Sequence, residues 1–221
     1  MAIRALLLDW DGTVVDSKAT ILAAYHVASE EVVGRRFPVD PEDVEHIIQL
    51  RGADAFPIVC GGDLSLVPRF TERFAEVYRA TAGQAPAFPG MAETLRALAA
   101  DGVQIGIVTS KARMRVDPDI ERVGLGEGVL SVTITGDDVA EAKPHPEGIV
   151  KALRALGARP EEAAYVGDGP NDLLASRGAG VRVFGVEFGF HPEELRAMQP
   201  DWMVSSYADI GAIVRRENAQ S

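Results

Sequence analysis

Short apolar runs that end in polar turns recur along most of the chain. Residues 3–8 form the first run, and the polar residues 9–13 follow it directly. A short apolar run of this kind is typical of a strand that is buried on both faces. The same pattern predicts strands over residues 103–108, 131–135, 163–166 and 181–186, with a short sixth strand over residues 203–204.

Helical patterns lie between these predicted strands. Apolar residues at helical spacing, with Pro at the start or Gly after the end, predict helices over residues 91–100, 146–156, 171–178 and 192–198. Strands that alternate with helices predict an α/β fold, here a Rossmann-like parallel sheet with helices on both faces. Sites in such sheets form at the carboxyl ends of the strands, which is where the polar clusters lie.

The segment from residue 16 to residue 87 interrupts this alternation. Its pattern is helical, with helices predicted over residues 19–33, from Asp40 to about Gly52, and within residues 67–82. We therefore predict a small all-helical domain over residues 16–87, inserted after the first strand. Residues 1–15 and 88–221 would form the Rossmann-like core. The polar tail, residues 215–221, is expected to fray.

The composition narrows the choice of partners and compartment. A chain of 221 residues with 47% hydrophobic positions fits one core plus a small accessory domain. Its net charge of −11 repels phosphate backbones and anionic lipid, so neither nucleic acid nor a membrane is an expected partner. No apolar run reaches the length of a membrane helix or a signal peptide. With one cysteine, Cys60, no intrachain disulfide forms, and we expect a cytoplasmic monomer or homodimer.

Asp9 and Asp11 provide the first candidate chemistry. A spacing of two in an extended stretch puts both carboxylates on the same side of the chain, and Gly12 lets backbone approach a ligand closely. Two carboxylates this close repel each other, so either one is protonated or a cation neutralises them. For the pair taken alone, a solvated Asp-Gly turn is the alternative.

Further polar clusters follow the later strands. Thr109 and Ser110 offer hydroxyls and backbone N–H groups that suit an anion, although Ser110 also fits a helix N-cap. Lys143 precedes a proline that favours extended backbone, which puts its cation on a stiff loop. Asp168 at a strand end can ligate a hard cation such as Mg²⁺, and Asp172 suits the first turn of a helix. Each of these residues, taken alone, also fits a surface or capping position.

The order of these clusters resembles the haloacid dehalogenase superfamily of phosphatases. The four motifs of that superfamily resemble Asp9-Trp10-Asp11-Gly12-Thr13, Thr109, Lys143, and Asp168 with Asp172. The phosphoglycolate-phosphatase-like subgroup, which has a helical cap, is similar at Val15-Asp16-Ser17, Phe88-Pro89-Gly90 and Thr135-Gly136-Asp137-Asp138. Trp10 and Ser110 depart from the commoner residues, but neither departure removes a group that the reaction requires.

The resemblance implies a phosphoric monoester hydrolase that acts on a small phosphorylated metabolite, such as phosphoglycolate or a sugar phosphate. Asp9 would be the nucleophile that forms an aspartyl-phosphate, and Asp11 would be the general acid and base. Mg²⁺ would be held by Asp9, the Asp11 backbone carbonyl and Asp168. The resemblance further implies phosphate binding by Gly12, Thr109, Ser110 and Lys143, and orientation of Lys143 or the metal site by Asp172.

Two questions stay open in the sequence. Arg51 either reads the leaving group of the substrate, as a cap specificity loop would, or is a surface arginine near a helix C-terminus. A sugar phosphomutase of the same superfamily and a non-catalytic phosphometabolite-binding protein are the alternative functions. Halide release is disfavoured because it needs neither Asp11 nor Asp168. A phosphonate hydrolase is disfavoured because residues 19–87 contain no Lys for a Schiff base.

Overall fold

The chain divides into two compact units in the computed structural model. One unit comprises Met1–Asp16 and Ala87–Ser221, and the other comprises Ser17–Pro86. The structure describes residues 1–37, 44, 47–48, 50, 52–83, 85–126 and 128–220. The predicted helix from Asp40 to about Gly52 falls mostly outside these residues.

The first unit is built on a parallel sheet, six-stranded among the described residues, with the order β3-β2-β1-β4-β5-β6. Every neighbouring pair of strands is parallel. The strands are β1 (Ala5–Leu8), β2 (Gln104–Val108), β3 (Leu130–Ile134), β4 (Ala163–Gly167), β5 (Arg182–Val186) and β6 (Trp202–Val204). The structure confirms the expected α/β fold, and each predicted strand lies within two residues of the observed bounds.

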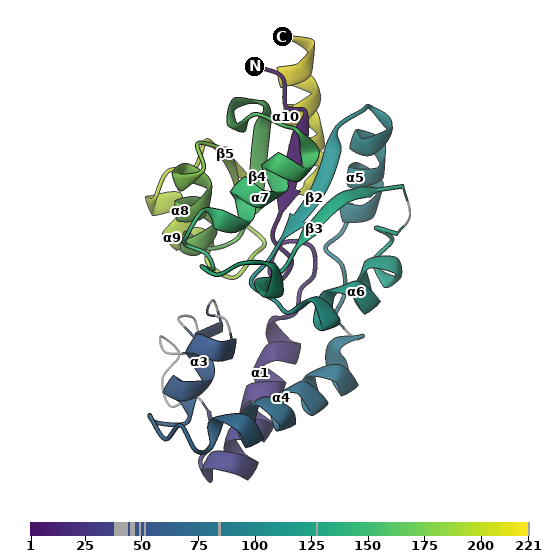
Figure 1. Ribbon diagram of the computed structural model, residues 1–221. Helices are drawn as coiled ribbons and strands as arrows, with labels where there is room; N and C mark the ends of the chain where they lie inside the picture. Colours follow the sequence, from purple (N-terminus) through teal and green to yellow (C-terminus); the bar gives the residue numbers. More distant parts are fainter. Residues whose placement is uncertain are drawn as a thin grey trace. The chain divides into compact units, whose positions relative to one another are not determined.

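Helices cover both faces of this sheet (Figure 1). On one face, α7 packs against β1, β2 and β3, while α8 and α9 pack against β5. On the other face, α5 contacts β2 and α10, and α10 contacts β6. The helices are α5 (Met91–Ala100), α6 (Arg113–Arg122), α7 (Glu147–Leu156), α8 (Pro170–Gly178), α9 (Pro192–Ala197) and α10 (Tyr207–Ala219), with 3₁₀ turns at Gly136–Asp138 and Pro160–Glu162.

Strand β1 is central, and its position places the first polar motif in the middle of the sheet edge. Leu8 is in register with Ile107 of β2 and Val166 of β4. The side chains of Ala5 and Leu7 belong to the core cluster that includes Ile149 of α7. Since side chains alternate along a strand, Leu6 and Leu8 point to the opposite face, and all four residues are fully buried. This two-sided burial explains the uninterrupted apolar run.

The second unit is helical and has its own aromatic core. Its elements are α1 (Lys18–Ala28), a π-helical turn (Ser29–Val33), α3 (Gly52–Val59) and α4 (Val67–Ala82). Tyr25 of α1 lies with its ring centroid 4.8 Å from that of Phe74 on α4, and Phe56 of α3 lies 5.1 Å from Phe70. The predicted helix over residues 19–33 is thus an α-helix that widens into a π turn before Gly34, which has a φ of 76°.

The expectation that the tail frays is wrong. Helix α10 runs to Ala219, and its buried residues, among them Tyr207, Ile210 and Val214, are three and four positions apart. The Asn218 side chain accepts a hydrogen bond from the Ile3 N–H at 2.6 Å and donates to the Ile3 carbonyl at 3.1 Å. The polar tail is therefore helical as far as Ala219, and the Asn218 amide ties it to the N-terminal backbone. Within the described ranges, no helix has both the length and the apolar character needed to cross a bilayer.

Candidate active site

Asp9 lies directly after the central strand, beside a buried lysine. The Asp9 backbone N–H donates to the Val166 carbonyl at 3.0 Å, which continues the pairing of β1 with β4. The Lys143 ammonium lies 2.7 Å from Asp9 Oδ1 and 2.6 Å from Asp172 Oδ1. The Lys143 side chain is 8% exposed. One ammonium therefore joins the end of β1 to the start of α8.

Asp172 organises the turn between β4 and α8. Its Oδ2 accepts from the backbone N–H groups of Asp168, at 3.1 Å, and of Gly169, at 3.2 Å. These N–H groups precede the first turn of a helix, where a carboxylate is a favourable acceptor. With Oδ1 bonded to Lys143, both oxygens of Asp172 are engaged by donors. Asp172 thus caps the turn before α8 and pairs with Lys143 in the same geometry.

Tyr165 also forms a hydrogen bond with Lys143. Its hydroxyl donates to the Val108 carbonyl at 2.7 Å, which ties β4 to β2 across the central strand. The Lys143 ammonium donates to the Tyr165 oxygen at 3.2 Å. Burial raises the pKa of Tyr165 well above its usual range, so the hydroxyl keeps its proton and its role as donor. Tyr165 was part of a predicted strand, and nothing in its spacing distinguished it from the other apolar positions.

The electrostatics of the site are dominated by burial of like charges. Burial raises the pKa of Asp9 to about 7, and the Lys143 ammonium opposes that shift. Burial also raises the pKa of Asp168 well above its usual range, with Asp172 and Asp9 adding repulsion. Burial alone would lower the pKa of Lys143, but Asp172 and Asp9 together hold it well above its usual value. The three clustered carboxylates of Asp9, Asp168 and Asp172 thus carry more charge than the Lys143 ammonium beside them neutralises, and the cluster favours an added cation.

The donor set fits a hard divalent cation. One carboxylate oxygen from each of Asp9, Asp168 and Asp172 lies within 4.8 Å of the other two. Because both oxygens of Asp172 already accept from N–H groups and Lys143, Asp9 and Asp168 are the better placed ligands. Asp168 is held by the Phe190 N–H, which donates to its Oδ2 at 2.9 Å. Buried oxygen ligands of this kind suit Mg²⁺.

Two glycines make room for Asp168. A Cβ at Gly12 would overlap the Asp168 carboxylate, and a Cβ at Gly189 would overlap the Asp168 Cβ. Gly12 also has a φ of 76°, a conformation that favours glycine. Gly12 therefore lies against the carboxylate cluster, as the first motif predicted for a close backbone approach. Gly189 was not singled out in the sequence, because no nearby polar motif marked it.

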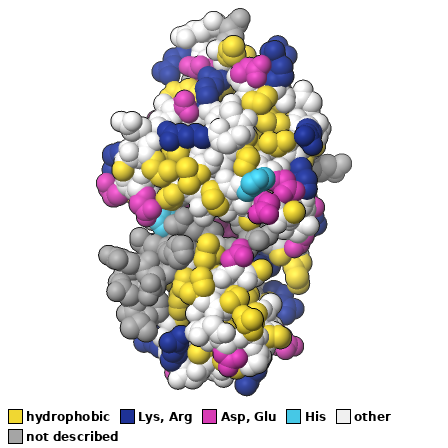
Figure 2. Space-filling model, turned by 60° about the vertical axis from the view of Figure 1, so that its left-hand side comes forward, with side chains coloured by type: hydrophobic (Ala, Val, Ile, Leu, Met, Phe, Trp, Pro, Cys, Tyr) yellow, Lys and Arg dark blue, Asp and Glu magenta, His cyan; other side chains and the backbone are white. Residues whose placement is uncertain are grey.

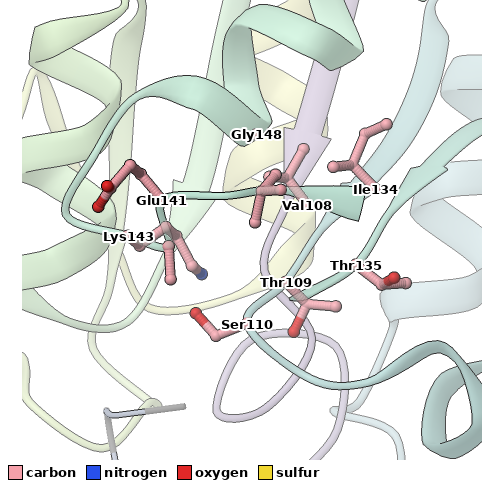
Figure 3. A pocket seen from close by; sticks show the side chains of 10 residues that line it. Val108, Thr109, Ser110, Ile134, Thr135, Glu141, Lys143 and Gly148 are labelled. Atoms are coloured by element: carbon pink, nitrogen blue, oxygen red, sulfur yellow. The ribbon is translucent and has the colours of Figure 1, made fainter. Parts of the chain in front are cut away.

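A small pocket opens beside this cluster (Figure 3). Its lining includes Thr109 and Ser110 from the end of β2 and Lys143 from the loop before α7. In Figure 3 these polar side chains lie along one side, whereas Val108 and Ile134 form the apolar side. The structure thus brings the predicted anion-binding hydroxyls and the predicted cation to one cavity. Hydroxyl and ammonium donors around a pocket can hold the oxygens of an anion.

Lys111 is a site residue that the sequence analysis missed. Its ammonium lies 2.8 Å from Asp11 Oδ1, and its side chain is only 3% exposed. Asp11, by contrast, is 22% exposed and reaches the surface of the site. The two residues are 100 positions apart in the chain, so no local spacing predicts the pair.

The remaining candidates lie elsewhere or outside the described residues. Arg51 falls outside the residues that the structure describes. Trp10 is fully buried, so its departure from the commoner residue affects packing behind the motif. Cys60 is buried in the core of the helical unit, together with Phe56 and Phe70. On the face drawn in Figure 2, Lys and Arg side chains lie among Asp and Glu and form no continuous basic patch over the described residues.

The chain is similar in sequence to known hydrolases. A family model described as haloacid dehalogenase-like hydrolase matches residues 6–186. The chain is 32% identical to a phosphoglycolate phosphatase from Yersinia pseudotuberculosis, over 95% of this chain and 92% of that protein. It is 31% identical to the pyrophosphatase PpaX from Bacillus pumilus, over 96% of both chains.

The solved structures agree at the level of the fold. A crystal structure from Haemophilus somnus, described as a predicted phosphoglycolate phosphatase, superposes with a TM-score of 0.83 at 26% identity. The superposition covers 96% of this chain and 97% of that one. The named curated relatives are phosphatases, and they support the same class of enzyme for this chain. By the extent of the family match, the chain belongs to the haloacid dehalogenase-like hydrolases.

Proposed function

We propose that this protein is a magnesium-dependent phosphatase that hydrolyses a small phosphorylated metabolite through an aspartyl-phosphate at Asp9. The observation that carries the proposal is the placement of Asp9, which lies 2.7 Å from Lys143 and within a cluster of buried carboxylates. A carboxylate in this setting is an effective nucleophile once its charge is balanced. Membership of a hydrolase family whose named relatives are phosphatases supports the reaction class.

In the first step, an Asp9 oxygen attacks phosphorus and the bond from phosphorus to the leaving oxygen breaks. Lys143 lies beside the attacking carboxylate, so its ammonium can offset charge on the phosphoryl oxygens. Thr109 and Ser110 line the pocket that Lys143 also lines, and their hydroxyls are further candidate donors. The backbone at Gly12 comes close to the carboxylate cluster, where a Cβ would overlap the Asp168 carboxylate.

Asp11 carries the proton in both steps. It donates a proton to the leaving oxygen as that oxygen departs from phosphorus. In the second step it accepts a proton from water, which attacks phosphorus and releases Asp9 and inorganic phosphate. The 22% exposure of the Asp11 side chain fits a group that must meet both a leaving group and water.

Magnesium would be held by the Asp9 and Asp168 carboxylates and the Asp11 backbone carbonyl. When bound, the ion reduces the repulsion between the nucleophile and the phosphate and stabilises transition-state charge. Asp168 is oriented for this role by the Phe190 N–H. Asp172 orients Lys143 and the turn that carries Asp168, since its oxygens bind both.

The substrate class is a small phosphorylated metabolite or a short phosphoanhydride. The named relatives act, by their names, on phosphoglycolate and pyrophosphate, and both molecules carry a compact anionic leaving group. We assign the helical unit, Ser17–Pro86, as the cap that selects among such leaving groups. Arg51 is the residue that we propose for reading them, because a guanidinium can pair with a carboxylate or phosphate in two-point geometry.

A panel of phosphorylated compounds tests the proposal. Purified protein with Mg²⁺ is assayed for phosphate release from phosphoglycolate, pyrophosphate, sugar phosphates and p-nitrophenyl phosphate, and kcat/KM is compared. Asp9→Asn is the control for contaminating phosphatases and is expected to be inactive on every compound. Turnover of at least one compound by wild type alone supports the proposal. A sugar phosphate that is isomerised only in the presence of a bisphosphate primer would instead identify a phosphomutase.

A further inference from the structure

Lys111 is the residue of this site whose role the four motifs leave unassigned. Its ammonium pairs with Asp11 Oδ1 at 2.8 Å, and its side chain is almost completely buried. We propose that Lys111 is a positioning residue that orients Asp11 for proton exchange with the leaving oxygen. This inference rests on the proposed function, in which Asp11 is the general acid and base.

The backbone of Lys111 is fixed from two sides. Its N–H donates to Thr109 Oγ1 at 3.2 Å, and its carbonyl accepts from the Gly136 N–H at 2.9 Å. A Cβ at Gly136 would lie 2.5 Å from the Ser110 carbonyl oxygen, so only glycine lets the two loops approach this closely. The loop that carries Lys111 is therefore pinned to the end of β3.

The turn that contains Gly136 is itself closed by Asp138. Asp138 Oδ2 accepts from the Thr135 N–H at 2.8 Å, from the Thr135 hydroxyl at 2.7 Å and from the Arg113 guanidinium at 2.7 Å. Arg113 lies two residues after Lys111, and its own N–H donates to Asp137 Oδ2 at 2.8 Å. Hydrogen bonds on both sides of Lys111 thus fix its backbone, and the burial of its side chain restricts where the ammonium can lie.

The ammonium anchors one oxygen of the Asp11 carboxyl group. An ammonium only donates hydrogen bonds, so Asp11 Oδ1, which it contacts at 2.8 Å, acts as an acceptor. This anchoring holds the carboxyl group at a defined position beside the end of β1. Fixed geometry of this kind contributes to rate because proton transfer requires donor and acceptor within hydrogen-bond reach.

Leaving-group dependence provides the test. Lys111→Met is compared with wild type on ethyl phosphate, whose strongly basic ethoxide leaving group needs protonation, and on p-nitrophenyl phosphate, whose weakly basic phenolate leaving group needs little. We expect kcat/KM to fall roughly 10- to 100-fold on ethyl phosphate, the scale of a lost hydrogen bond to a charged group. On p-nitrophenyl phosphate the loss should stay below about threefold, because departure does not depend on Asp11. Lys111→Arg keeps the charge and the donors and should recover part of the ethyl phosphate activity.

A double-mutant cycle isolates the coupling to Asp11. If Lys111 acts through Asp11, then Lys111→Met causes no further loss in an Asp11→Asn background. Arg182→Met is the matched control, because it removes a 3.0 Å pair with Glu217 at the amino end of β5, away from the site. Its activity should equal that of wild type. Melting curves report folding, and Lys111→Gln is the second variant where Lys111→Met is poorly folded.

Three results would overturn the inference. These are an equal loss on both esters, an additive loss in the Asp11→Asn background, and a loss confined to substrates with an anionic leaving group such as phosphoglycolate. The last result would make Lys111 a substrate-reading residue. Asp9→Asn separates these failures from failure of the proposed function, since an active Asp9→Asn protein contradicts the function itself whatever Lys111 does.

Discussion

Gly12 and Asp168 lie in direct contact, although 156 positions separate them in the chain, and a Cβ at Gly12 would occupy the space of the Asp168 carboxylate. The contact joins the loop after β1 to the loop after β4. It explains why a glycine follows the two aspartates of the first motif, since any side chain there would displace a candidate metal ligand.

Gly12→Ala is expected to abolish activity with only a moderate loss of stability. The new Cβ moves the Asp168 carboxylate, while the positive φ adds strain of roughly 1–2 kcal/mol. Gly157→Ala is the control, because Gly157 also has a positive φ, of 63°, but a Cβ there meets no atom within 4 Å. Both variants should melt at a lower temperature than wild type, and only Gly12→Ala should lose turnover and Mg²⁺ affinity. Full activity of Gly12→Ala would show that turnover does not depend on the position of the Asp168 carboxylate.

Asp172→Asn is expected to lower kcat/KM roughly 10- to 100-fold. The amide keeps one acceptor but loses the charge that binds Lys143, and its NH₂ group must face either an ammonium or backbone N–H donors. The measurement is kcat/KM on p-nitrophenyl phosphate together with a melting curve. Asp209→Asn is the control, because Asp209 accepts from the hydroxyls of Ser205 and Ser206 at the start of α10. If Asp172→Asn and Asp209→Asn are equally active, Asp172 does not contribute to the function of the site.

Activity is expected to require Mg²⁺ and to be inhibited by Ca²⁺. The cluster of Asp9, Asp168 and Asp172 supplies oxygen ligands for either ion. Calcium accepts more ligands in looser geometry, so it can engage both oxygens of Asp9 and hold that carboxylate out of line for attack. Phosphate release is measured after exhaustive chelation and after return of each ion separately. Activity without any divalent ion, or equal activity with Ca²⁺, contradicts the metal assignment.

Asn218→Leu is expected to destabilise the protein by about 1–3 kcal/mol. The substitution leaves the Ile3 N–H and carbonyl without their amide partner in a part-buried position. Urea unfolding followed by circular dichroism gives the free energy, with Gln220→Ala as the control at the exposed end of the chain. If the two variants unfold at the same urea concentration, the tail contributes nothing to stability.

The sequence predicts the fold correctly where a segment follows a single hydrophobic pattern. Strands such as β1 and β4 are buried on both faces, and their unbroken apolar runs predict them directly. Helix α6 was missed because Pro118 and its many charged residues obscure the helical pattern. Helix α10 was missed although Tyr207, Ile210 and Val214 have the spacing of a buried face, since the polar tail favoured disorder.

The sequence predicts those residues of the candidate site that belong to local motifs. Asp9, Lys143 and Asp172 lie in the connections that follow β1, β3 and β4, so the parallel topology predicts that they gather at one edge of the sheet. The pairing of Lys111 with Asp11 depends on how two loops pack, and no pattern within either loop records it. The contact between Gly189 and Asp168 likewise depends on how two loops pack. Tertiary contacts of this kind become visible only with the fold.

The central claim is that Asp9 becomes phosphorylated during turnover, and rapid acid quench tests it directly. The enzyme is mixed with Mg²⁺ and a ³²P-labelled substrate, stopped in acid within the first turnover, and treated with borohydride, which reduces an aspartyl-phosphate to homoserine. Mass spectrometry of the N-terminal peptide then identifies the modified residue. We predict transient labelling that appears before free phosphate, homoserine at position 9 and no label in Asp9→Asn. Full turnover without any label, or label on another residue, would contradict the mechanism.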